Sequence, residues 1–114
     1  MTITDQEEKI ISEVFLIISR NIKGRIPILE LCLKYNISES TLTRGFKHVY
    51  GKTIYQYHLE TAMNYAKELL ASGYPVKFIT IELGYKTSGS FARAFKKMYG
   101  KSPSTFIPRK SMHF

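Results

Sequence analysis

The sequence predicts an all-helical (all-α) domain in which one helix-turn-helix unit occurs twice. Apolar residues recur at helical spacing, a ten-residue stretch returns later in the chain, and the excess of basic residues begins only after residue 35. The 114 residues, 44% of them hydrophobic, suffice for one domain with a buried core. We expect an N-terminal helix and the first helix-turn-helix in residues 1–52, a linker helix in 53–73, and the second helix-turn-helix and a C-terminal helix in 74–114.

Two helices are expected before the first recognition helix. The first has a buried apolar stripe at helical spacing, formed by Ile11, Val14, Phe15 and Ile18. The second, over residues 28–35 behind Pro27, is the supporting helix. A turn at Asn36 and Ile37 joins it to the recognition helix.

The first recognition helix is predicted between Ser38, a good N-cap residue, and Gly51, which ends it. Its inner face carries apolar residues at helical spacing: Leu42, Phe46 and Val49. Its outer face is polar and basic: Ser40, Thr43, Arg44 and Lys47.

A longer linker helix follows. Thr53 and Gln56 form a capping-box pattern, and Gly73 and Pro75 end the helix. Apolar residues keep helical spacing along it: Leu59, Ala62, Met63, Ala66, Leu69 and Leu70. At 1.5 Å per residue this helix is roughly 30 Å long, close to the ~34 Å between successive turns of B-DNA. We therefore hypothesise that it holds the recognition helices in adjacent major-groove segments.

The second unit repeats the first. Residues 44–53 return as 93–102 at a constant offset of 49, which continues upstream to match Ser38 with Thr87. Cys32 matches Thr80 at an offset of 48, so one extra residue lies in the second turn. The supporting helix is expected at 76–83, and the recognition helix has Phe91, Phe95 and Met98 inside and Gly89, Ala92, Arg93 and Lys96 outside. Ser102 and Pro103 open a short last helix.

The net charge of +8 indicates a polyanionic partner. Basic and acidic residues cancel over residues 1–35, and no acidic residue follows Glu82. Nucleic acid is the first expectation and an anionic membrane surface the second. Because the longest strongly apolar run is Val14 to Ile18, no segment is long enough to span a bilayer.

Other classes of site are not expected. Cys32, the single cysteine, excludes an internal disulfide and a Cys-rich zinc site, and we expect a buried, inert thiol. The histidines lack metal-ligand spacing, and His58 and His113 are expected to be ordinary surface residues. No nucleophile or phosphate-loop motif is recognisable, so we predict no enzyme, cofactor or metal. The polar, acidic N-terminus is unlike a secretory signal, which favours a reducing cytoplasm.

From about Pro27 to Phe106 the chain resembles the DNA-binding domain of the AraC/XylS family of bacterial transcription regulators. The resemblance is carried by Ile79-Thr80-x-x-Leu83-Gly84-Tyr85, Ser88-x-x-Phe91-x-Arg93-x-Phe95-Lys96, Tyr99-Gly100-x-Ser102-Pro103-x-x-Phe106 and, in the first unit, Ser38-x-x-x-Leu42-x-Arg44-x-Phe46-Lys47. It implies a seven-helix domain of two helix-turn-helix subdomains joined by a long linker helix. Each half then places one helix in the major groove.

The resemblance also implies which side chains contact DNA. Base-edge contacts fall on Ser40, Thr43 and Arg44 in the first half and on Gly89, Ser90 and Arg93 in the second. Phosphate contacts are expected at Ser38, Lys47, His48, Thr87, Lys96 and Lys97. Gly89 offers no side chain, so the second unit is expected to read fewer bases, and the unequal outer faces indicate an asymmetric site.

The predicted function is sequence-specific binding to double-stranded promoter DNA that regulates transcription, more commonly by activation through RNA polymerase, with repression left open. Family members usually carry an N-terminal sensor or receiver domain, and none is visible in this sequence. The alternative is a sequence-indifferent nucleic-acid or architectural binder. The helical spacing of Phe46, Phe91 and Phe95 assigns these rings to the core rather than to stacking on single strands.

Overall fold

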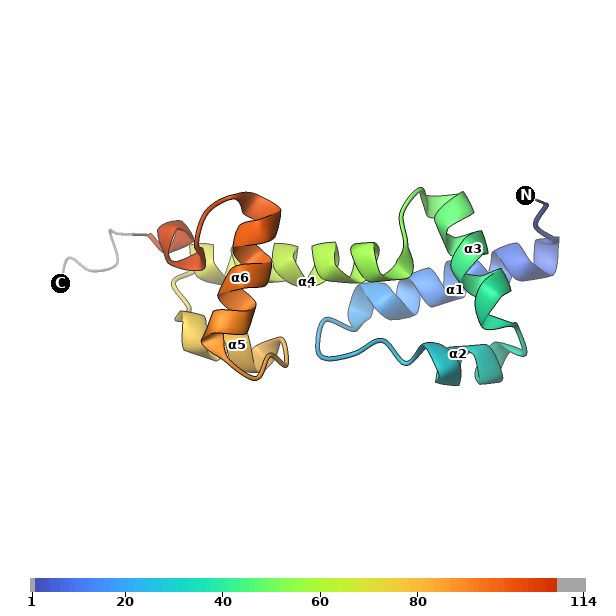
Figure 1. Ribbon diagram of the computed structural model, residues 1–114, viewed down its shortest axis with the longest axis horizontal. Helices are drawn as coiled ribbons and strands as arrows, with labels where there is room; N and C mark the ends of the chain where they lie inside the picture. The colour runs from blue at the N-terminus through green and yellow to red at the C-terminus, as the bar shows by residue number, and fades with distance from the viewer. Residues whose placement is uncertain (1, 109–114) are drawn as a thin grey trace. The chain divides into compact units, whose positions relative to one another are not determined.

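The computed structural model describes residues 2–108 and is helical throughout its regular elements (Figure 1). These elements are α1 (Asp5–Arg20), α2 (Ile28–Tyr35), α3 (Glu39–Tyr50), α4 (Ile54–Ala71), α5 (Val76–Glu82), α6 (Ser88–Tyr99) and the 3₁₀-helix η1 (Pro103–Phe106). The chain forms two compact units, and the boundary between Glu60 and Thr61 falls within α4. The predicted all-helical class is confirmed, but the seventh predicted helix is only a four-residue 3₁₀-helix.

In the N-terminal unit, α1 begins with a capping box. The Thr4 hydroxyl accepts a hydrogen bond from the Glu7 backbone N–H, and the Glu7 carboxylate accepts one from the Thr4 N–H, both at 3.0 Å. The apolar face of α1 then packs against α3 (Figure 1). The buried core of this unit consists of Ile10, Ile11, Val14, Ile18, Ile26, Ile28, Leu31, Leu42, Phe46 and Ile54.

An aromatic cluster closes this core. Phe15, expected to be buried, is half-buried, and its ring stacks on Tyr50 at 4.3 Å and on Tyr57 at 4.6 Å between ring centroids. Tyr57 belongs to the first turns of α4, and its hydroxyl bonds to that of Ser19. The predicted capping box of α4 is also present, since Thr53 and Gln56 exchange two hydrogen bonds. The start of α4 is therefore part of the N-terminal unit.

The C-terminal unit has its own core of side chains from α4, α5 and α6. The buried side chains of this unit are Ala62, Met63, Ala66, Leu70, Ile79, Thr80, Leu83, Phe91 and Phe95, together with Pro103 of η1. At the end of the unit, the Phe95 ring meets Phe106 of η1 edge to face at 5.2 Å. The Tyr99 hydroxyl donates to the Asn64 side-chain oxygen at 2.7 Å. These contacts hold η1 against α6 and the end of α6 against α4.

Other side chains also differ from the sequence expectation. Val49 is 40% exposed and Leu59 37% exposed, although both were expected on inner faces. Val49 lies in the last turn of α3, next to the exposed Gly51 at which the helix ends. Cys32 is half-buried rather than buried. His58 is half-buried rather than a surface residue, and its Nε2 atom is buried without a hydrogen-bond partner.

His113 lies outside the described residues. None of the helices in residues 2–108 is long and apolar enough to cross a membrane.

Candidate nucleic-acid interface

The two recognition helices, α3 and α6, begin in the same way. The Ser38 hydroxyl oxygen accepts from the Thr41 backbone N–H at 3.1 Å, and the Thr87 hydroxyl oxygen accepts from the Ser90 backbone N–H at 3.0 Å. Each helix ends at a glycine with φ of +77°, Gly51 in α3 and Gly100 in α6. The predicted Ser38 cap and Gly51 end are therefore confirmed, and the matching residues Thr87 and Gly100 have the same roles in α6. The N–H groups left free in each first turn make these helix starts favourable for anions.

On α3 the predicted contact residues share one outer face. The side chains of Ser40, Arg44, Lys47 and His48 are exposed, and so is the Ser38 cap. Thr43 is half-buried, and its hydroxyl donates to the Glu39 carbonyl at 2.9 Å. The Thr43 hydroxyl proton is therefore engaged, and its oxygen is best suited to accept a hydrogen bond.

On α6 the outer face is more basic and has less side-chain variety. Arg93, Lys96 and Lys97 are exposed, as is the Thr87 cap. The Arg93 guanidinium folds back toward Gly89, because a Cβ built at Gly89 would lie 3.5 Å from Arg93 Nη1. A methyl group at position 89 would therefore be in ordinary van der Waals contact with the arginine.

Ser90 differs from the other predicted base contacts. Its hydroxyl lies 2.7 Å from that of Thr87, and the residue is half-buried. Ser90 thus participates in the cap of α6, as Thr41 does in α3. Its freedom to contact a base is lower than that of Ser40.

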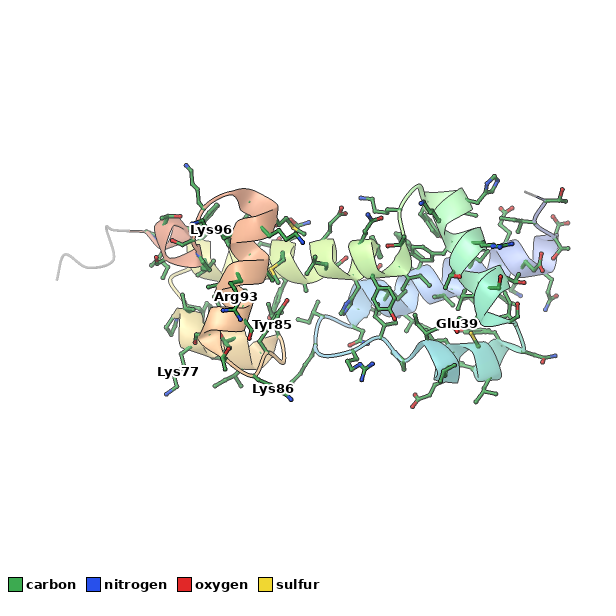
Figure 2. The ribbon with its side chains drawn as sticks, viewed as in Figure 1. Glu39, Lys77, Tyr85, Lys86, Arg93 and Lys96 are labelled. Carbon is green, nitrogen blue, oxygen red and sulfur yellow. The ribbon has the colours of Figure 1, made fainter. Side chains whose placement is uncertain are left out.

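Further cations surround α6. Lys77 on α5 and Lys86 in the turn are exposed, and Figure 2 shows them with Arg93 and Lys96 on the C-terminal unit. Lys86 belongs to the basic excess of the chain, but the sequence pattern predicts no DNA contact for it. Its signal was its position directly before the Thr87 cap, where a cation lies at the start of the recognition helix.

The turns differ between the units. In the C-terminal unit the buried Thr80 hydroxyl lies 2.8 Å from the Val76 carbonyl oxygen and 3.4 Å from the Ser88 hydroxyl oxygen. The matching pair in the N-terminal unit is Cys32 and Glu39. Burial and, secondly, the Glu39 carboxylate raise the pKa of the Cys32 thiol. The thiol is therefore kept protonated, which disfavours a nucleophilic role.

Comparison with known proteins agrees with this geometry. Residues 31–109 match a family described as a helix-turn-helix domain. The chain is 32% identical over 80 residues to the HTH-type transcriptional regulator RipA of Corynebacterium diphtheriae, covering 70% of this chain and 24% of that protein.

Two solved structures share the fold. A probable AraC family transcriptional regulator from Rhodopseudomonas palustris is 24% identical, with a TM-score of 0.73 over 87% of this chain and 94% of the other. The DNA-binding domain of AdpA, solved in complex with a target DNA, is 17% identical, with a TM-score of 0.67 over 90% of each chain. The chain spans about a quarter to just over a third of the length of several curated relatives that it matches.

Proposed function

The chain belongs to the AraC-type helix-turn-helix family, and on this premise we propose that it binds a specific duplex DNA sequence and thereby regulates bacterial transcription. One observation carries the proposal. Each recognition helix presents an exposed arginine, Arg44 or Arg93, six residues after its hydroxyl cap. An arginine fork can bind both N7 and O6 of guanine in the major groove, so each helix has a residue able to read a base.

The side chains around each arginine fall into two groups, those proposed to contact base edges and those proposed to bind phosphates. In the N-terminal unit Ser40 and Thr43 read base edges beside Arg44, and Lys47, His48 and the Ser38 cap bind phosphates. In the C-terminal unit Arg93 reads with support from Ser90 and the close backbone of Gly89. There, Lys96, Lys97 and the Thr87 cap bind phosphates. Phosphate contacts fix the position of the helix in the groove and carry no sequence information themselves.

Both recognition helices engage the same duplex in this proposal. The 18 residues of α4 give a helix about 27 Å long, comparable with the ~34 Å between successive turns of B-DNA. Adjacent major-groove segments are therefore the proposed targets. Because Ser40 and Thr43 correspond to Gly89 and Ala92, the two half-motifs should differ in sequence.

Selection of bound duplexes from a random pool tests this function. We expect two short, unlike half-motifs about one helical turn apart. Binding to the selected duplex should survive competition by random duplex, since specific sites are typically about 10³-fold or more tighter. A sequence-indifferent architectural binder would yield no motif and lose its duplex to the competitor.

The wider biological role is proposed from the family. We place the chain in the bacterial cytoplasm, acting on promoter DNA together with RNA polymerase, with activation as the first expectation. A sensor or receiver domain N-terminal to these residues would supply the signal. The proposal includes no catalytic step. Measuring promoter output with and without the chain in a purified transcription reaction distinguishes activation from repression.

A further inference from the structure

Glu39 is an acidic side chain at the tip of a helix that otherwise presents polar and basic residues. It is the first residue of α3, directly after the Ser38 cap, and it is exposed (Figure 2). The N-terminal residues of a recognition helix are those that reach base edges. Glu39 therefore lies beside Ser40 at the end of α3 expected to enter the groove.

Within residues 2–108 Glu39 forms no ion pair, since the one ion pair there joins Lys52 to Glu60. An uncompensated carboxylate is repelled by phosphates and by the acceptor atoms of guanine and thymine. Its favourable partner in the major groove is an exocyclic amino group, above all N4 of cytosine. The chemistry of the side chain thus restricts which base can lie opposite it.

The C-terminal unit provides the contrast. The residue matching Glu39 is Ser88, a neutral side chain whose hydroxyl oxygen lies 3.4 Å from that of Thr80 on α5. A carboxylate at a helix start also stabilises the helix dipole whether or not DNA is bound. Glu30, exposed in the first turn of α2, can have the same dipole effect without lying on a recognition helix. Glu30 is therefore the matched control.

We infer that Glu39 is a specificity-determining residue of the N-terminal unit, whose carboxylate accepts a hydrogen bond from cytosine N4 and disfavours the other bases at that position. The inference rests on the proposed DNA-binding function. Glu39 is then a fourth base-contacting residue of the N-terminal unit, beside Ser40, Thr43 and Arg44.

Duplex selection with the wild-type chain, Glu39→Gln, Glu39→Ala and Glu30→Gln tests it. The wild type should select cytosine at one position of the first half-motif, with about a tenfold preference. Glu39→Gln should shift that preference toward adenine, because a glutamine amide can bind adenine N6 and N7 together. Glu39→Ala should lose the preference, and Glu30→Gln should leave the whole motif unchanged. Circular dichroism checks that each variant remains helical.

The outcomes separate the inference from the proposed function. If the wild type selects two half-motifs and the Glu39 variants select the same ones, Glu39 is a helix-stabilising residue and the inference is wrong. A uniform gain in affinity on all duplexes for both Glu39 variants would also overturn it, since removing repulsion alone has that effect. A wild-type chain that selects no motif would overturn the proposed function as well.

Discussion

Gly45 and Ala94 occupy the same position of the two recognition helices, and their surroundings explain why they differ. A Cβ on Gly45 would lie 2.5 Å from Cδ1 of the fully buried Ile11 on α1. The C-terminal unit instead tolerates the methyl group of Ala94, which is half-buried. The repeat therefore preserves the recognition helix and its caps, whereas the packing behind the helix was fitted separately in each unit.

Charge separates the two units further. Residues 1–60 carry eight lysines and arginines against seven aspartates and glutamates, whereas residues 61–114 carry nine against two. In the N-terminal unit Lys52 is paired with Glu60, while Lys101 matches Lys52 in the C-terminal unit. Neutralising phosphates supplies the salt-dependent part of affinity. We therefore expect residues 61–114 to contribute most of that part and the N-terminal unit to contribute mainly base discrimination.

The largest predicted effect tests what the units share. Phe46→Ala and Phe95→Ala each remove a fully buried ring from the matching position of one unit. Each should lower the free energy of unfolding by about 3–5 kcal/mol in urea denaturation. Val49→Ala, at an exposed position of α3, should cost less than about 1 kcal/mol. A loss at Phe46 no larger than at Val49 would contradict the proposed core.

The second prediction concerns the paired arginines. Arg44→Ala and Arg93→Ala should each reduce discrimination at particular base pairs, by about 1–3 kcal/mol, and at different half-motifs. Lys47→Ala should weaken binding to all duplexes evenly. It should also reduce the slope of log affinity against log salt concentration by about one. Titrations on single-base variants of the selected duplex measure both effects. An equal loss on all sequences for Arg93→Ala would show that this arginine only binds phosphate.

The third prediction concerns Gly45 and Ala94 themselves. Gly45→Ala should lower the free energy of unfolding by about 1–2 kcal/mol, since the clash of the new Cβ with Ile11 outweighs the better helix propensity of alanine. The double variant Gly45→Ala with Ile11→Val should recover part of this loss, because valine lacks the Cδ1 atom that the new Cβ meets. The reverse change, Ala94→Gly, should cost about 1 kcal/mol through helix propensity alone. Additive losses in the double variant would show that the two residues do not compete for space.

These comparisons also show what the sequence could predict. Helix positions, caps and ends followed from apolar spacing and from residues such as Ser38, Thr87, Gly51 and Gly100, because these signals are local. The need for glycine at position 45 could not be predicted, since it depends on Ile11, distant in sequence and supplied by another helix.

The candidate interface shows the same limit. Repeat matching placed Arg44 and Arg93 on the outer faces, where the structure has them exposed. It gave no reason to expect the Ser90 hydroxyl to lie in the cap, or the Arg93 guanidinium to fold toward Gly89. Both depend on side-chain geometry that spacing does not determine. The DNA contacts of these residues remain predictions.

The fourth prediction uses His58, which has no histidine counterpart in the second unit. Burial lowers the pKa of His58, and a hydrogen bond with the Asn21 backbone partly opposes this. His58 is therefore protonated at a higher pH in the unfolded chain than in the folded one. The free energy of unfolding should fall as the pH drops below the ordinary histidine pKa of about 6.5. His58→Gln should reduce this slope in urea denaturation between pH 7.5 and 5.5. An unchanged slope would show that other groups control the pH dependence.

The smallest predicted effect tests how the turns differ. Glu39 is the second cause, after burial, of the raised pKa of Cys32. Glu39→Gln should therefore lower that pKa and speed iodoacetamide alkylation of Cys32 near pH 8, because the thiolate is the reactive form. Glu30→Gln is the control and should leave the rate unchanged. An unchanged pH profile in Glu39→Gln would mean that burial alone sets the thiol pKa. A lowered pKa would show that the Glu39 charge acts on the turn of the N-terminal unit, where the C-terminal unit has neutral hydroxyls instead.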